Sequence, residues 1–137
     1  MMKIQKAKIL CVCAKGLNRS KYLAEYLKTD GYETRYGGLE GINPGEESPN
    51  PINQEDVDWA DAIIIVRRRL EPILRGKFNA HHKKVIVLDI TDSERLIKEN
   101  HPELAHLTKE ELNKKVTYPA LRKAIKSHLP LKLKRLK

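Results

Sequence analysis

A cysteine and an arginine stand six residues apart near the start of the chain, in the segment Cys13-Ala14-Lys15-Gly16-Leu17-Asn18-Arg19-Ser20. A loop of this length can curl so that its backbone N–H groups and the N-terminus of a following helix face one bowl, which binds a tetrahedral oxyanion. The guanidinium of Arg19 can grip two oxygens of that anion, a geometry that a lysine cannot match. The same positive field favours the thiolate form of Cys13. The segment therefore predicts a sulfur nucleophile at a phosphate-binding loop that runs from Ala14 to Ser20.

Attack of a thiolate on a phosphomonoester also requires a proton for the leaving oxygen, and later an activated water. The stretch 89–93, Asp-Ile-Thr-Asp-Ser, follows an apolar run and supplies two carboxylates. We expect Asp92 to be the general acid, with Asp89 as the alternative. A helix cap is the structural role that would also explain Asp92.

Three further side chains near the loop have two interpretations each. Ser20 either stabilises the thiolate or caps the following helix. Asn18 either braces the loop through its side-chain amide or belongs to the phosphate site. Cys11 is a buried strand residue or an oxidation partner of Cys13, although a disulfide between positions so close on an extended strand would be strained.

Apolar runs and turn residues divide the chain into alternating strands and helices. We expect strands over residues 7–12, 32–36, 62–66 and 84–88, and a long loop over 37–53, which holds four glycines and three prolines. We expect helices from the phosphate-binding loop to Gly31, from a cap at Asn53 to Trp59, over 68–74 with an end near Gly76, from a capping box of Thr108 and Glu111, and from Pro119 to Leu129.

This alternation is typical of an α/β three-layer sandwich, a parallel sheet with helices on both faces. Ligands of such sheets bind at the carboxyl ends of the strands, where the Cys13 loop and the 89–93 turn both fall. At 137 residues the chain is expected to form one domain over residues 1–129, followed by a basic tail over 130–137.

Composition narrows the class of protein. Hydrophobic residues make up 40% and charged residues 33%, as in a water-soluble globular protein, and no apolar run is long enough to span a bilayer. Two cysteines and no disulfide framework favour a reducing, cytoplasmic location. The net charge of +9 attracts polyanions without choosing between phosphoproteins and nucleic acid. We expect a phosphorylated protein or a small phosphate ester as the partner, with weak nucleic-acid binding through the basic surface and no membrane.

The pattern Cys-x5-Arg-Ser after an apolar strand resembles the signature of the low-molecular-weight protein-tyrosine phosphatases. The stretches 59–66 and 88–92 are similar to a compact bacterial and archaeal branch of predicted phosphatases on that fold, and the likeness covers residues 7 to 105. It implies a four-stranded parallel sheet in the order 2-1-3-4, with Cys13 as nucleophile, Arg19 as phosphate clamp, Ser20 as thiolate-stabilising hydroxyl and Asp92 as acid. It also implies hydrolysis of phosphomonoesters, above all protein phosphotyrosine, without a cofactor or a metal ion.

Other functions stay open at this stage. The stretches 18–20 and 31–35 are similar to the relative that removes phosphate from serines of the RNA polymerase II tail, so phosphoserine is an alternative substrate. A catalytically weak module that binds phosphate or RNA is a second alternative. Arsenate reductases on the same fold need further cysteines downstream, and the sequence has none after Cys13.

Overall fold

Four parallel strands form the centre of the computed structural model, which describes residues 6–41, 43 and 46–131. The strands stand in the order β2-β1-β3-β4, as the resemblance implied. They are β1 (Lys8–Cys13), β2 (Glu33–Gly38), β3 (Ala62–Ile65) and β4 (Lys84–Val87). Every predicted strand is present, and its ends are shifted by two residues at most.

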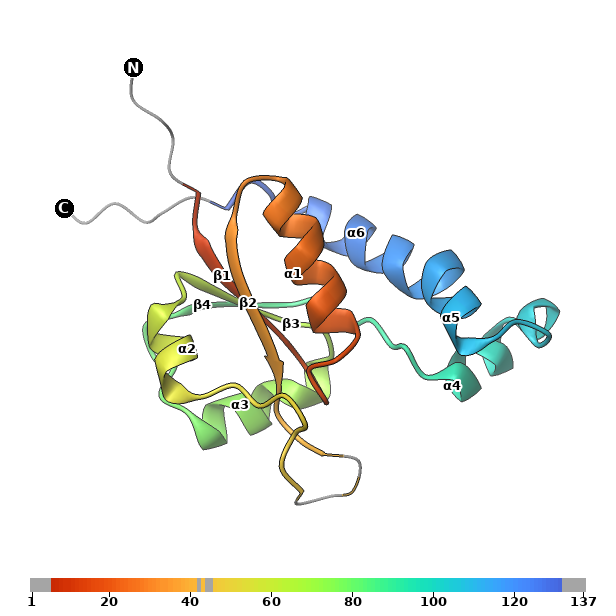
Figure 1. Ribbon diagram of the computed structural model, residues 1–137, viewed down its shortest axis with the longest axis horizontal. Helices are drawn as coiled ribbons and strands as arrows, with labels where there is room; N and C mark the ends of the chain where they lie inside the picture. Colours follow the sequence, from red (N-terminus) through yellow and green to blue (C-terminus); the bar gives the residue numbers. More distant parts are fainter. Residues whose placement is uncertain (1–5, 42, 44–45, 132–137) are drawn as a thin grey trace.

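Helices cover both faces of this sheet, which confirms the predicted three-layer α/β architecture (Figure 1). One face packs against α1 (Arg19–Thr29) and α6 (Tyr118–Lys126), and the other against α2 (Gln54–Trp59) and α3 (Glu71–Lys77). Alternate residues of the central strand β1 enter the two cores, Ile9 and Cys11 on the first face and Leu10 and Val12 on the second. The continuous apolar run of β1 is therefore explained by burial on both sides.

The cap at Asn53 is confirmed and is more complete than predicted. Its side chain accepts a hydrogen bond of 2.8 Å from the backbone N–H of Asp56, whose carboxylate accepts one of 3.1 Å from the N–H of Asn53. This reciprocal pair is a capping box, and it fixes the start of α2 after the long loop.

The predicted helix end near Gly76 is confirmed to within one residue, although Gly76 itself does not terminate the helix. A 3-10 turn, η1 (Arg68–Leu70), runs directly into α3, which continues through Gly76 to Lys77 and ends at the extended residue Phe78. Gly76 lies on an open side of the helix, where a Cβ would meet no atom within 4 Å. Nothing at this position requires the left-handed backbone with which a glycine ends a helix.

The C-terminal third differs most from the prediction. Helix α4 (Glu94–Asn100), capped by Ser93, and the 3-10 turn η2 (Pro102–Leu104) were not predicted. The capping box of Thr108 and Glu111 begins α5 (Lys109–Leu112) as expected. However, a π-helical segment, η3 (Asn113–Thr117), joins α5 to α6, so the two expected helices are one continuous rod. Such a wide turn accommodates Pro119, which has no N–H to donate to the preceding turn.

The end of the described chain packs on the sheet layer. Helix α6 ends at Lys126 rather than at Leu129. Leu131 is buried, its N–H donates to the hydroxyl of Tyr32 at 2.8 Å, and its carbonyl accepts from the N–H of Ala7 at 3.2 Å. Leu131, in the stretch expected to be a basic tail, thus packs against the rest of the chain, and residues 132–137 of that tail lie outside the described part. None of the helices in the described ranges has the length and apolar character needed to cross a membrane.

Candidate active site

The sulfur of Cys13 lies at the carboxyl end of β1, where the chain turns into α1. It is 3.1 Å from Oγ of Ser20 and 3.2 Å from the backbone nitrogen of Gly16, whose N–H points at the sulfur. Helix α1 begins at Arg19 with Asn18 as its N-cap, so Ser20 does not cap the helix, which corrects that interpretation. Its hydroxyl is instead fully buried beside the thiol.

The peptide carbonyls of the loop are held outward by the segment that follows β2. Each carbonyl from Cys13 to Gly16 accepts a hydrogen bond from this segment. The donors are Leu39 N to Cys13 and Ala14, Glu40 N to Ala14, Ser48 Oγ to Lys15 and Asn50 Nδ2 to Gly16, at 2.7 to 3.2 Å. Because the N–H groups of such a loop face away from its carbonyls, this bracing turns the amides toward the sulfur side. The long loop predicted over 37–53 thus shapes the anion site from behind, a role that its sequence did not reveal.

Two glycines permit this close contact between the loop and β2. Gly16 has a φ of +76°, which favours glycine, and a Cβ there would lie 2.4 Å from the nitrogen of Gly38. A Cβ on Gly38 would lie 2.5 Å from the carbonyl oxygen of Ala14. Both positions therefore exclude a side chain.

Arg19 turns its guanidinium from the first turn of α1 toward the turn after β4. Its Nη1 donates to the carbonyl of Ile90 at 2.8 Å, and its Nε lies 3.4 Å from Oδ1 of Asp92. Burial lowers the pKa of Arg19, while the charges of Asp92 and Cys13 act against that shift. Within the described part of the chain the buried Nε has no hydrogen-bond partner. The Nε thus has an ion pair with Asp92 but no hydrogen bond in this part of the chain, and its N–H is suited to donate to an anion oxygen.

The two candidate acids have different surroundings. Asp92 lines the pocket described below, and its Oδ2 accepts a hydrogen bond of 2.8 Å from Nδ2 of Asn18. Asp89 has a φ of +56°, and its carboxylate accepts from the N–H of Arg68 at 3.0 Å, at the start of η1. Ser93, not Asp92, caps α4, so the helix-cap interpretation of Asp92 is wrong. The geometry thus places Asp92, and not Asp89, beside Arg19.

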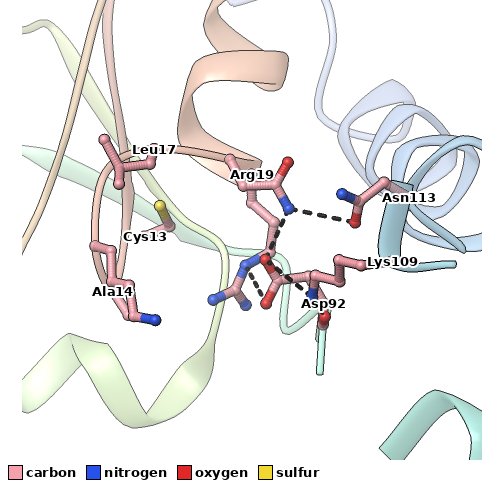
Figure 2. Close-up of a pocket in the computed structure, with 9 residues that line it drawn as sticks. Cys13, Ala14, Leu17, Arg19, Asp92, Lys109 and Asn113 are labelled. Atoms are coloured by element: carbon pink, nitrogen blue, oxygen red, sulfur yellow. Dashed lines mark hydrogen bonds and ion pairs between the residues drawn. The ribbon is translucent and has the colours of Figure 1, made fainter. Parts of the chain in front are cut away.

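These groups border a pocket of about 370 Å³ (Figure 2). Its walls come from the phosphate-binding loop, the turn after β4 and the continuous helical segment 109–126 formed by α5, η3 and α6, here called the C-terminal rod. The lining residues are Cys13, Ala14, Lys15, Leu17, Asn18, Arg19, Asp92, Lys109 and Asn113. Lys109 and Asn113 were not expected from the sequence, where they are two ordinary polar residues of a helix. Lys109 Nζ also bonds to the backbone carbonyl of Asp92.

Cys11 lies on the same strand as Cys13 but inside the core. Its thiol is fully buried, and the two cysteines are free thiols. Burial, and then the nearby charge of Cys13, raise the pKa of Cys11, so its thiol stays protonated. These surroundings suit the expected buried strand residue.

Comparison with known proteins places the fold. No protein-family model and no curated protein matches the sequence. Among solved structures, a low-molecular-weight phosphotyrosine phosphatase of Vibrio cholerae O395 is similar with a TM-score of 0.57, 18% identity, and coverage of 90% of this chain and 94% of that one. A mutant of YwlE from Bacillus subtilis has a TM-score of 0.56 and 14% identity over 88% and 95% of the two chains. The chain therefore has the fold of the low-molecular-weight phosphotyrosine phosphatases.

Proposed function

We propose that the protein is a cysteine-dependent phosphatase that hydrolyses phosphomonoesters through a cysteinyl-phosphate. The observation that carries this proposal is the pairing of Cys13 and Arg19 in one pocket. The sulfur faces an amide and a hydroxyl, both able to donate to a thiolate, and the buried Nε of Arg19 has no hydrogen-bond partner among the described residues. A phosphoryl group in this pocket would supply the missing acceptor.

The first step forms a bond between sulfur and phosphorus. The thiolate of Cys13 attacks, the bond from phosphorus to the ester oxygen breaks, and the loop amides and Arg19 stabilise the charge on the equatorial oxygens. Asp92, in its protonated form, transfers its proton to the departing oxygen, so an alcohol leaves and a cysteinyl-phosphate remains.

The second step reverses the roles. The carboxylate of Asp92 takes a proton from water, the water oxygen bonds to phosphorus, and the bond from sulfur to phosphorus breaks. Inorganic phosphate leaves and the thiolate is restored. The hydroxyl of Ser20 and the N–H of Gly16 stabilise the sulfur charge in both steps, as attacking and as leaving group.

The first candidate substrate is phosphotyrosine of a phosphoprotein. The reaction would take place in a reducing compartment such as the cytoplasm, where the sulfur of Cys13 is not oxidised. The second candidate is phosphoserine or another aliphatic phosphate ester. This candidate is supported by the pocket lining, which contains no aromatic residue among the described ones and includes the polar side chains of Lys109 and Asn113. The ring of a bound phosphotyrosine would therefore find no aromatic side chain in this lining to stack on.

The test is hydrolysis of a phosphotyrosine peptide, a phosphoserine peptide and phenyl phosphate, with release of inorganic phosphate as the readout. We expect Cys13→Ser to lower kcat by about 10⁴-fold or more, because no other nucleophile replaces the sulfur. Cys11→Ala, on the same strand but in the core, is the matched control and should keep its activity.

Two results would contradict the proposal. Wild-type rates in Cys13→Ser would remove the sulfur from the mechanism. A wild-type protein that binds phosphate or RNA but releases no phosphate from any of these esters would instead be a binding module.

A further inference from the structure

The side chain of Asn18 connects the phosphate-binding loop to the candidate acid and to the C-terminal rod. Its Nδ2 donates to Oδ2 of Asp92 at 2.8 Å and to Oδ1 of Asn113 at 3.3 Å. Its Oδ1 accepts from the hydroxyl of Tyr118 at 2.6 Å. Although Asn18 is the N-cap residue of α1, its side chain makes no cap hydrogen bond. The amide therefore serves partners 74 to 100 residues away and not its own helix.

Tyr118 is itself held rigidly. Its ring stacks on that of Tyr22 from α1, with centroids 3.9 Å apart and planes 2° from parallel, and the hydroxyl of Tyr22 accepts from Arg122. Burial and the nearby charge of Asp92 raise the pKa of Tyr118, which keeps its hydroxyl a donor. The protonated hydroxyl donates to the oxygen of the Asn18 amide, and Asp92, which as a carboxylate can only accept, takes the NH₂ group on the other side.

Asp92 receives a defined orientation from this contact. Its Oδ2 is occupied by the Asn18 amide, while Oδ1 lies 3.4 Å from Nε of Arg19. Figure 2 shows the Asp92 carboxylate beside Arg19, on the side of the pocket toward Lys109 and Asn113. Oδ2 is therefore held by the NH₂ group, and Oδ1, on the side of Arg19, is the oxygen that can carry the acidic proton once a phosphoryl group accepts from the Nε–H of Arg19.

We infer that Asn18 is a positioning residue for the general acid: Tyr118 sets the orientation of the Asn18 amide, and the amide directs Oδ1 of Asp92 toward the pocket. This inference rests on the proposed function and adds to it the residue that orients the carboxyl group of the acid, Asp92. It assigns Asn18 a role beyond the phosphate loop and gives the C-terminal rod a part in the reaction.

The dependence on the leaving group separates this role from phosphate binding. An aliphatic alkoxide needs its proton during bond cleavage, whereas 4-nitrophenolate leaves readily without one. Loss of acid positioning should therefore slow the hydrolysis of a phosphoserine peptide and spare 4-nitrophenyl phosphate. Loss of phosphate binding would raise KM for both substrates.

The experiment compares Asn18→Ala and Tyr118→Phe with wild type on both substrates. We expect kcat for the phosphoserine peptide to fall by about 10- to 100-fold in Asn18→Ala, as for loss of a hydrogen bond to a charged group, with KM nearly constant. For 4-nitrophenyl phosphate kcat should change by less than about threefold. Tyr118→Phe should show the same selectivity with a smaller amplitude, because it removes only the hydroxyl.

Tyr26→Phe is the matched control, because Tyr26 also flanks Tyr22, at 6.4 Å, and lies outside the pocket lining. It should behave as wild type. In an Asp92→Asn background, Asn18→Ala should cause no further loss, since two residues that act as one unit are not additive.

Each outcome is informative. Equal loss of kcat on both substrates, a rise in KM alone, or additivity with Asp92→Asn would overturn the positioning role while leaving the phosphatase proposal intact. A wild-type rate in Tyr118→Phe, with loss in Asn18→Ala, would overturn the part assigned to Tyr118. If the wild-type protein hydrolyses neither ester, or if Cys13→Ser is as active as wild type, both the proposed function and this inference fall.

Discussion

The hydroxyl of Ser20 lies 3.1 Å below the sulfur of Cys13, inside the first turn of α1 and without exposure to solvent. Strand β1 ends with the cysteine, and the loop returns the chain just far enough for the second residue of the helix to reach it. A buried hydroxyl beside a buried sulfur costs free energy unless the two are bonded. Their contact is therefore part of both the core and the pocket.

Replacement of this hydroxyl should weaken the nucleophile without dismantling the pocket. We expect Ser20→Ala to lower kcat and the rate of iodoacetamide alkylation of Cys13 at pH 6 by about 10-fold or more, the effect of one hydrogen bond to a charged group. Ser127→Ala is the control, because that hydroxyl donates to the carbonyl of Ala124 at the end of its own helix, away from the pocket lining. Unchanged alkylation in Ser20→Ala would show that the hydroxyl does not act on the thiolate.

Adding a single methyl group between the phosphate-binding loop and β2 should destabilise the protein. In Gly38→Ala the new Cβ would lie 2.5 Å from the carbonyl oxygen of Ala14, so we expect a loss of about 1–3 kcal/mol in the free energy of unfolding. Phosphate affinity should fall with it, because the loop must move. Urea titration and competition with inorganic phosphate measure the two effects.

Gly76→Ala is the matched control for that variant. Its Cβ would meet no atom within 4 Å, and the residue lies within α3, so alanine should stabilise the protein by about 0.5–1 kcal/mol. A Gly38→Ala protein as stable and as active as wild type would mean that the loop is not pressed against β2.

The two thiols should differ sharply in reactivity. Cys13 lines the pocket, whereas Cys11 is fully buried and its pKa is raised by burial, so only Cys13 should react with iodoacetamide near neutral pH. Inorganic phosphate should slow that reaction by occupying the loop. Peptide mass mapping after partial alkylation distinguishes the sites, and carbamidomethylation at Cys11 in the folded protein would contradict the geometry.

The hydroxyl of Tyr118 should make stability depend on alkaline pH. The folded pKa of Tyr118 is raised above its ordinary value of about 10, so its contribution is complete below that pH and is lost as the pH rises through the folded value. The difference in unfolding free energy between wild type and Tyr118→Phe should therefore be constant up to about pH 10 and shrink above it. A difference that grows with pH would have the wrong sign.

Several features of the fold could be predicted because their causes are local. The apolar run of β1 and the aliphatic run of β3 have the composition of strands buried on both faces, and Asn53 and Thr108 carry the side chains that begin helices. Helix α4 escaped prediction because its cap, Ser93, was assigned to a loop, and only Ile97 of that helix is buried. The continuous rod was not predicted because the π-helical segment 113–117, just before Pro119, has no clear signal in the sequence.

The sequence alone determined which groups meet in the loop and so indicated the proposed chemistry: a cysteine, an arginine six residues later and a glycine between them, all within one short segment. Only the tertiary structure decided what surrounds it. The position of Asp92 beside Arg19, the hydrogen bond from Asn50 to the loop, and the contacts of Asn18 with Asp92 and Tyr118 all join residues 34 to 100 positions apart. Such contacts depend on how the layers pack around the sheet, and no local pattern of residue types encodes that packing.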